Sequence, residues 1–158
     1  MDNVALFIRQ CQFANVTTPR GFLIAQTAFN LKLELKQTVF SNLRLIGEEQ
    51  AGLVGTMIGY FVVQNVAFVD CELRCSAQCG VLFGELYAAG RLFDCVFSGK
   101  FVPGGENVRV GLLAGVRTTT VDVSVEKVQN FIVFQNQTCD DVRRVEAGDA
   151  AMTQQPVQ

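Results

Sequence analysis

The sequence predicts an all-β protein, a right-handed parallel β-helix of about five coils with a repeat of about 30 residues. The first observation behind this prediction is a five-residue segment with a small residue at each end and mostly apolar residues between. These glycine segments are Gly21–Ala25, Ala51–Gly55, Gly80–Gly84 and Gly111–Gly115. Their starts are separated by 30, 29 and 31 residues, and a fixed period of this length is typical of repeat architectures.

The second observation is a four-residue segment that repeats in step with the first. It has a polar residue, an apolar residue, any residue and another apolar residue. These polar segments are Gln10–Phe13, Asn42–Leu45, Asp70–Leu73, Asp94–Phe97 and Asn130–Val133. Their intervals average 30 residues, so both segments follow one period. The competing fold is an antiparallel β-sandwich of short strands, and the common period counts against it.

The third observation is strand-like alternation between these segments. Residues 4–16 predict a strand with Phe7, Cys11 and Phe13 on its inner face, and 16–21 predict a turn that contains Pro and Gly. A short apolar strand follows at 22–24. Residues 29–36 alternate perfectly between apolar and polar, which predicts a half-buried strand. Its inner face is expected to hold Phe29, Leu31, Leu33 and Leu35.

The later coils repeat this scheme, with strands predicted at 39–46, 60–63, 66–73, 121–125 and 130–134. The third coil has only ten residues between Gly84 and Asp94, where its neighbours have fifteen. We expect this coil to lose or shorten one strand. The segment Pro103–Asn107 is the strongest turn signal and an insertion, so it is expected to protrude and to tolerate change.

The chain is expected to form a solenoid domain over residues 1–137, followed by a different segment over 138–158. Thr138–Asp141 has the pattern of a helix capping box, which predicts a short helix that covers the end of the solenoid. The polar residues from Gly148 onward predict a disordered tail.

Stacked coils place equivalent positions in ladders, and these ladders predict the core. Leu82 and Leu113 are expected to point inward and to stack on each other and on Leu53 or Val54. Both ends of such a helix are strand edges, so end-to-end self-association is expected unless the ends are capped.

The run from Gly52 to Gly115 resembles the GLUG repeat of bacterial and protist surface proteins. The matching residues are Gly52–Gly55, Gly59, Asn65, Gly80–Gly84, Gly90, Asp94–Gly99 and Gly111–Gly115. The resemblance implies a parallel β-solenoid that works as an adhesin or other surface protein, at the cell surface or outside the cell. The chain departs from the motif by having cysteines at positions where small polar residues are usual.

Composition narrows the classes of partner. The 158 residues include 13 basic and 15 acidic side chains, for a formal charge of −2, and no histidine. Near-balanced charge predicts neither nucleic-acid binding nor attraction to an anionic membrane. No run approaches the roughly 18 apolar residues of a transmembrane helix, so no membrane insertion is expected. The N-terminal residues lack the pattern of a signal peptide, and the compartment stays open.

The six cysteines predict no metal site. Cys71, Cys75 and Cys79 are four residues apart, but the chain offers neither histidine nor a second cysteine pair to complete a zinc site. Small apolar ladder positions are the favoured interpretation. Cys71 and Cys95 occupy the same place in adjacent polar segments, so we expect them to form a disulfide if the protein is exported.

Asp70 and Asp94 occupy equivalent places in adjacent polar segments, so they are expected to stack. Two carboxylates about 5 Å apart could serve a retaining glycosidase. The other first residues of the polar segments are Gln10, Asn42 and Asn130, which favours a ladder of turn residues. We therefore expect no catalytic, cofactor or metal site.

The favoured function is a non-catalytic solenoid module with an adhesive, structural or interaction role, bound by protein or glycan ligands. The alternatives are a carbohydrate-active β-helix enzyme that uses Asp70 and Asp94, and a scaffold that self-associates through its ends.

Overall fold

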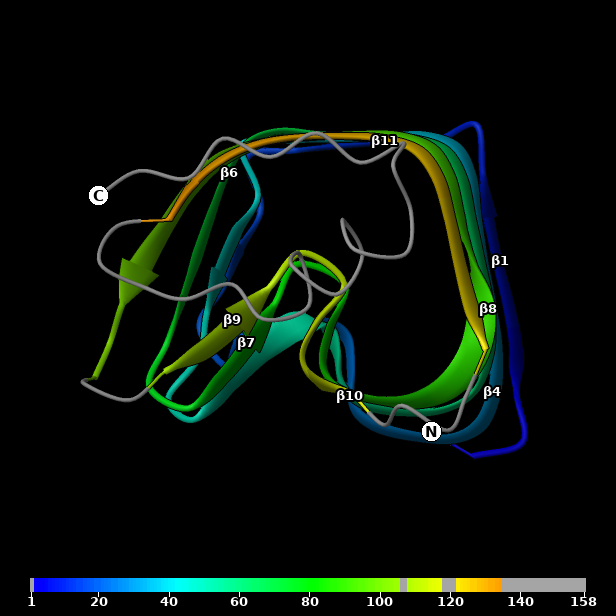
Figure 1. The fold of residues 1–158 in the computed structure, drawn as a ribbon, viewed down its shortest axis with the longest axis horizontal. Coiled ribbons are helices and arrows are strands. Elements are labelled where there is room, and N and C mark those ends of the chain that lie inside the picture. Colours follow the sequence, from blue (N-terminus) through cyan, green and yellow to red (C-terminus); the bar gives the residue numbers. More distant parts are fainter. Residues whose placement is uncertain (1, 106–107, 118–121, 135–158) are drawn as a thin grey trace.

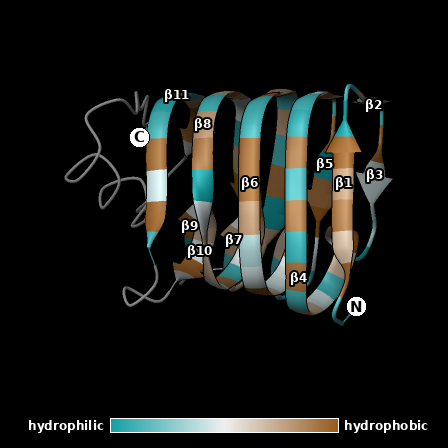
Figure 2. Ribbon diagram, turned by 90° about the vertical axis from the view of Figure 1, so that its right-hand side faces the viewer, coloured by the Kyte–Doolittle hydropathy of each residue, from teal (hydrophilic) through white to brown (hydrophobic). Residues whose placement is uncertain are grey.

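The computed structural model describes residues 2–105, 108–117 and 122–134, which form eleven strands and no helix. The strands are β1 (Ala5–Arg9), β2 (Gln12–Ala14), β3 (Thr17–Thr18), β4 (Phe22–Ser41), β5 (Arg44–Ile46), β6 (Gln50–Cys75), β7 (Gln78–Gly80), β8 (Phe83–Pro103), β9 (Arg109–Gly111), β10 (Ala114–Arg117) and β11 (Val123–Phe134). Figure 1 looks along the stack, so that successive coils overlie one another. Figure 2 shows β1, β4, β6, β8 and β11 side by side. The predicted all-β solenoid is confirmed.

Every strand pair is parallel, and each strand pairs with the equivalent part of the next coil. This excludes the antiparallel sandwich. The separation of paired residues grows from 27 between Ala5 and Lys32 to 33 between Gly90 and Val123. The stack completes about four turns, and the face that begins with β1 carries five strands because the first coil is incomplete. The right-handed sense of the helix stays a prediction.

The last three glycine segments lie in register, as predicted, whereas the first is shifted by one residue at its end, since Ala25 pairs with Val54 and not with Gly55. Val54 pairs with Phe83, and Phe83 pairs with Ala114. The preceding residues, Leu53, Leu82 and Leu113, therefore stack in the core, where each is at most 1% exposed. Figure 1 shows that the coils double back here, where the chain turns from β7 into β8 and from β9 into β10. Gly80 is required because a Cβ there would overlap the carbonyl oxygen of Phe83.

Long strands bend at corners without ending, because single residues in the left-handed conformation turn the chain. One column of such residues, the first corner column, consists of Gln10, Gln37, Asn65, Asp94 and Lys127, with φ between 50° and 54°. The second corner column consists of Asn15, Asn42 and Asp70, with φ between 52° and 57°. Asn and Asp tolerate this conformation better than most residues, which explains their recurrence.

An aromatic ladder fills the core between the two corner columns. Phe13, Phe40, Phe68 and Phe97 stack in consecutive coils with centroids 4.8–5.0 Å apart and rings within 9° of parallel. Phe97 pairs with Asn130 in the next coil, so Asn130 continues this ladder. It is fully buried, and its Oδ1 accepts a hydrogen bond from the Ile132 amide at 3.0 Å.

Three expectations about the strands are wrong. Phe7 and Phe29 are 49% and 47% exposed, not inward. Phe29 precedes the left-handed residue Asn30, and this extra residue reverses the alternation, so the inner face begins at Leu31. The third coil loses no strand, because β8 is continuous and keeps a constant separation of 29 from β6 between Phe83 and Phe97. The coil looks short in the sequence because Asp94 and Asp70 have the same residue type but turn different corners.

The insertion before β9 is present. Pro103 pairs with Cys75, 28 residues earlier, whereas Arg109 pairs with Gln78, 31 residues earlier, so three residues are added between these pairs. Gly104 and Gly105 are exposed, as expected for a protruding loop. The predicted helix at Thr138–Asp141 and the predicted tail lie outside the described residues.

Candidate binding surfaces

The structure separates Asp70 from Asp94. Asp94 lies in the first corner column, level with Asn65, whereas Asp70 lies in the second corner column above Asn42. Asn65 precedes Asp70 by five residues, which corresponds to about 16 Å of extended strand. This exceeds the carboxylate separation of both retaining and inverting glycosidases. The predicted Asp70–Asp94 pair is therefore wrong, because the polar segments mix two columns that carry similar residue types.

Amide side chains form ladders along the corners. Asn42 donates through Nδ2 to Asn15 Oδ1 at 2.8 Å, and Gln10 donates through Nε2 to Gln37 Oε1 at 3.3 Å. A carboxylate has no donor, so Asp70 cannot donate to Asn42 as Asn42 donates to Asn15. Among the described residues, no donor contacts the Asp70 carboxylate. The backbone N–H of Asp70 donates to the hydroxyl of Ser98 at 3.1 Å.

The second corner column ends at Asp70, because the coil above places no side chain at this corner. The four residues from Phe68 to Cys71 lie against only three residues, Phe97 to Gly99, because Cys71 pairs with Gly99. Gly99 turns this corner with φ 140°, and a Cβ there would overlap the carbonyl oxygen of Cys71. The position must therefore be glycine, and the surface above Asp70 stays open.

A groove of about 550 Å³ occupies this opening, and we call it the Asp70 groove. Its lining residues are Asn42, Arg44, Asp70, Cys71, Glu72, Ser98, Gly99, Lys100 and Phe131. Phe131 pairs with Ser98 from the coil above and is 37% exposed. The groove thus combines polar groups with one aromatic ring.

Ion pairs organise one side of the groove. Glu72 lies 3.5 Å from the guanidinium of Arg44 and 3.6 Å from the Lys100 ammonium, which come from the coils below and above. The two cationic side chains are 46% and 62% exposed, whereas Glu72 is 17% exposed. Exposed ion pairs of this kind contribute little to stability.

Exposed aromatic side chains gather around another corner, where Asn30 and Gly59 turn the chain. Phe29 and Tyr87 belong to one outward column, and Tyr60 lies just past the corner. Phe7 lies further along β1, level with Glu34 and four residues past the corner residue Asn3. We call these four residues together the aromatic corner; their side chains are 40–49% exposed. The Tyr87 hydroxyl donates to Glu85 at 2.8 Å, and this hydrogen bond raises the pKa of Tyr87.

Two cations lie beside the Phe7 ring. The Arg9 guanidinium lies 5.3 Å and the Lys32 ammonium 5.8 Å from the centre of the Phe7 ring. A shallow hollow of about 470 Å³ beside Tyr60 includes Arg91 and Asp122. Aromatic and Arg side chains are enriched in protein interfaces, so this surface is suited to recognition.

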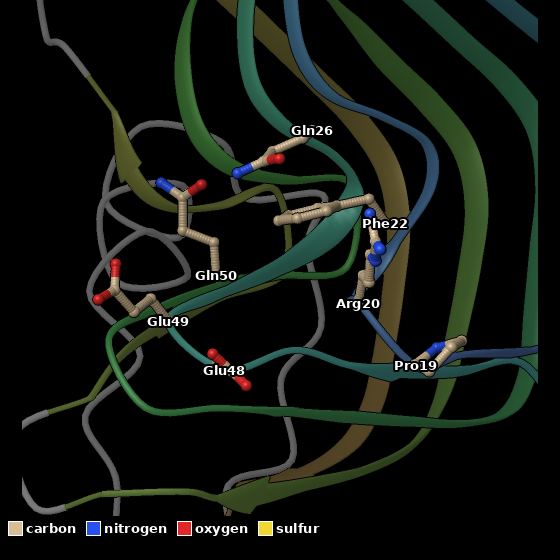
Figure 3. Close-up of a pocket in the computed structure, with 7 residues that line it drawn as sticks. All are labelled: Pro19, Arg20, Phe22, Gln26, Glu48, Glu49 and Gln50. Atoms are coloured by element: carbon tan, nitrogen blue, oxygen red, sulfur yellow. The ribbon is translucent and has the colours of Figure 1, made fainter.

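A third hollow, of about 340 Å³, lies where the coils double back (Figure 3). Its lining residues are Pro19, Arg20, Phe22, Gln26, Glu48, Glu49 and Gln50. In Figure 3 the side chains of Glu48 and Glu49 point in different directions, so they form no carboxylate pair. The Phe22 ring packs over Gly55, which indicates a structural role.

The cysteines differ from the prediction. Cys71 pairs with Gly99, and Cys95 lies level with Val66, so Cys71 and Cys95 are not stacked, and both are free and buried. Burial raises the pKa of each thiol to about 11. The disulfide joins Cys75 and Cys79, with Cα atoms 5.9 Å apart.

The spacing of four was visible in the sequence, but the short loop from the end of β6 to β7 that brings Cys75 and Cys79 together was not. In the described part of the chain, no three cysteine or carboxylate side chains gather as a metal site would require. None of the described residues forms a helix that could span a membrane.

Comparisons with family models, curated proteins and solved structures found no match to this chain.

Proposed function

We propose that this chain is a non-catalytic β-solenoid module that binds a protein or glycan ligand through its side surface. The GLUG resemblance of the segment from Gly52 to Gly115 supports a place at the cell surface or outside the cell. The observation that carries the binding role is the aromatic corner, where four rings are 40–49% exposed and one of them, Phe7, lies beside the cations of Arg9 and Lys32. Exposed clusters of this kind mark interaction sites in soluble proteins.

The arrangement of the acids supports the non-catalytic part of the proposal. Asp70 and Asp94 lie in different corner columns, and Glu72 is held by two cations. A glycosidase needs two carboxylates that converge on one bond, with different proton affinities. The register does not bring Asp70 and Asp94 together as such a pair.

Arrays of glycans and of purified surface proteins test the binding role. The double variant Tyr60→Ser/Tyr87→Ser removes two exposed rings and is expected to lose most of the binding. The matched control, Tyr60→Phe/Tyr87→Phe, keeps the rings and should retain most of it. Equal binding by wild type and the serine variant would remove the aromatic corner from the proposal.

Turnover of a polysaccharide panel tests the non-catalytic part. We expect no product from wild type. Product formation that disappears in an Asp70→Asn/Asp94→Asn variant would replace the proposal with the enzyme alternative.

Self-association is a second candidate, favoured by the first coil. β1 and β2 pair only with β4, and β3 pairs only with β5, so one edge of each strand has no strand partner among the described residues. The inward side chains Leu6, Ile8, Phe13 and Val16 are only partly buried. Light scattering should show concentration-dependent oligomers that Ile8→Lys disrupts. A monomer at every concentration would reject this candidate.

A further inference from the structure

We propose that the Asp70 groove binds a neutral sugar residue of a glycan. This inference rests on the proposed binding function and adds the site and the ligand class. It does not involve the aromatic corner, so the two can be tested separately.

The groove contains acceptor groups that hydroxyl groups of a ligand can satisfy. The Asp70 carboxylate accepts no hydrogen bond from a described residue. The side-chain amide of Asn42 donates through Nδ2 to Asn15, and no described residue donates to its Oδ1. The Ser98 hydroxyl is already used, since it accepts from Asp70 N and donates to the Phe68 carbonyl at 3.4 Å. Adjacent sugar hydroxyls could donate to the two open acceptors, and hydrogen bonds to a charged acceptor are the stronger kind.

The shape of the groove suits a flat ring. Ser98 pairs with Phe131, so the aromatic side chain comes from the coil above Gly99, whereas Asp70 comes from the coil below. Two coil spacings separate their strands by about 10 Å. A pyranose ring placed over Gly99 would contact Phe131 with its apolar face and Asp70 with its hydroxyls. Few precisely placed polar groups beside an aromatic wall are typical of small-molecule sites.

Charge favours a neutral ligand. The groove contains two cationic side chains, Arg44 and Lys100, and two carboxylates, Asp70 and Glu72, so its formal charges cancel. A sulfated glycan or a uronate would have to lie beside the uncompensated Asp70. A peptide could not add as a strand to β8, which forms the middle of the groove, because β8 is already paired with β6 on one edge and with β11 on the other.

A glycan array, followed by calorimetric titration of the best neutral oligosaccharide, tests the inference. Asp70→Asn should weaken binding about 10- to 100-fold, because it removes a charged acceptor. The fold should survive, since Asn15 and Asn42 occupy the same column in the same conformation. Asp94→Asn makes the identical change in the first corner column and should bind like wild type. Phe131→Ala should also weaken binding, and amide NMR shifts on titration should centre on Gly99 and Lys100.

Several results would overturn the inference. These are binding of charged glycans alone, absence of any bound neutral glycan, or equal affinity in wild type and Asp70→Asn. If glycan binding depended on Tyr60 and Tyr87 but not on Asp70, the groove would be rejected and the proposed function would stand. Hydrolysis of the bound glycan would instead reject the proposed function.

Discussion

The two corner columns have the same backbone conformation and different surroundings. In the first, every coil places a side chain at the corner, from Gln10 to Lys127. In the second, the column breaks above Asp70, where the next coil uses one residue fewer and turns at Gly99. Asp94 is therefore one member of a continuous ladder, whereas Asp70 lies under an opening.

This difference separates two roles of an aspartate at a corner. Both carboxylates satisfy the demand for a residue that tolerates positive φ, with values of 52° and 54° at Asp70 and Asp94. Asp70 also lines the Asp70 groove, of which Asp94 is not a part. Backbone conformation explains which residue types recur, and the neighbouring coil decides which of them can meet a ligand.

The largest loss of stability is expected from a substitution in the core, and the effects of substitutions at the corners can be compared with it. Leu82→Asp would bury a charge without a partner in the leucine ladder, where Leu82 is fully buried. We expect a loss of more than about 4 kcal/mol in the free energy of unfolding, enough to unfold the middle coils. Circular dichroism during chemical denaturation measures this. Leu82→Met, which conserves volume, should cost less than about 1.5 kcal/mol. A folded Leu82→Asp variant of unchanged stability would mean that the register is wrong.

Any side chain at Gly99, where the second corner column is interrupted, should destabilise the fold. Gly99→Ala would force a Cβ onto the carbonyl of Cys71 at φ 140°, so we expect about 3 kcal/mol of destabilisation. Asp94→Ala only loses a residue suited to positive φ and should cost about 1 kcal/mol. Denaturant midpoints of the two variants compare the corners directly. Equal costs would show that Gly99 is not confined by the coil below.

The Cys75–Cys79 disulfide lies at the end of β6, the strand that contains Asp70. A closed loop with a sequence separation of 4 stabilises by about 2 kcal/mol in the chain-entropy model. Reductant should therefore lower the melting temperature of wild type and leave a Cys75→Ser/Cys79→Ser variant unchanged. Insensitivity of wild type would indicate that the bridge does not form in the purified protein.

The smallest effect on stability is expected away from the corners, at the charged outer face that contains Glu34. Hydrogen bonds from Lys36 and Arg9, at 2.6 and 2.8 Å, lower the pKa of Glu34 from 4.5 to about 2. Its contribution to stability is therefore present above pH 4.5 and is lost as the pH falls toward 2. Glu34→Gln should flatten the loss of stability across this range. Glu126→Gln, at a carboxylate without an ion pair to any described residue, should not. Identical curves would remove Glu34 from the acid response.

The sequence located the leucine ladder correctly, because glycines at fixed positions leave one register for Leu53, Leu82 and Leu113. It misplaced the corners, since the coil length varies and two columns five residues apart use the same residue types. The pattern therefore predicts false partners for Asp70 and for Cys71, namely Asp94 and Cys95.

Other features depend on contacts that the pattern does not encode. Asn130 has the residue type of a corner but occupies a buried place above Phe97. Phe29 points outward because Asn30 interrupts the alternation. The Asp70 groove could not be predicted, because it arises from a single residue missing opposite Asp70 in the next coil.

Mild oxidation of paired cysteine variants tests the central claim, that Asp70 stacks above Asn42 and not beside Asp94. Neighbouring coils are about 4.8 Å apart, which lies within the Cα range of a disulfide. Asn42→Cys/Asp70→Cys should therefore form a new disulfide in high yield, identified by peptide mass spectrometry. Asp70→Cys/Asp94→Cys, with sites about 16 Å apart, should leave both new thiols free. A disulfide in the second variant but not in the first would contradict the register on which this account depends.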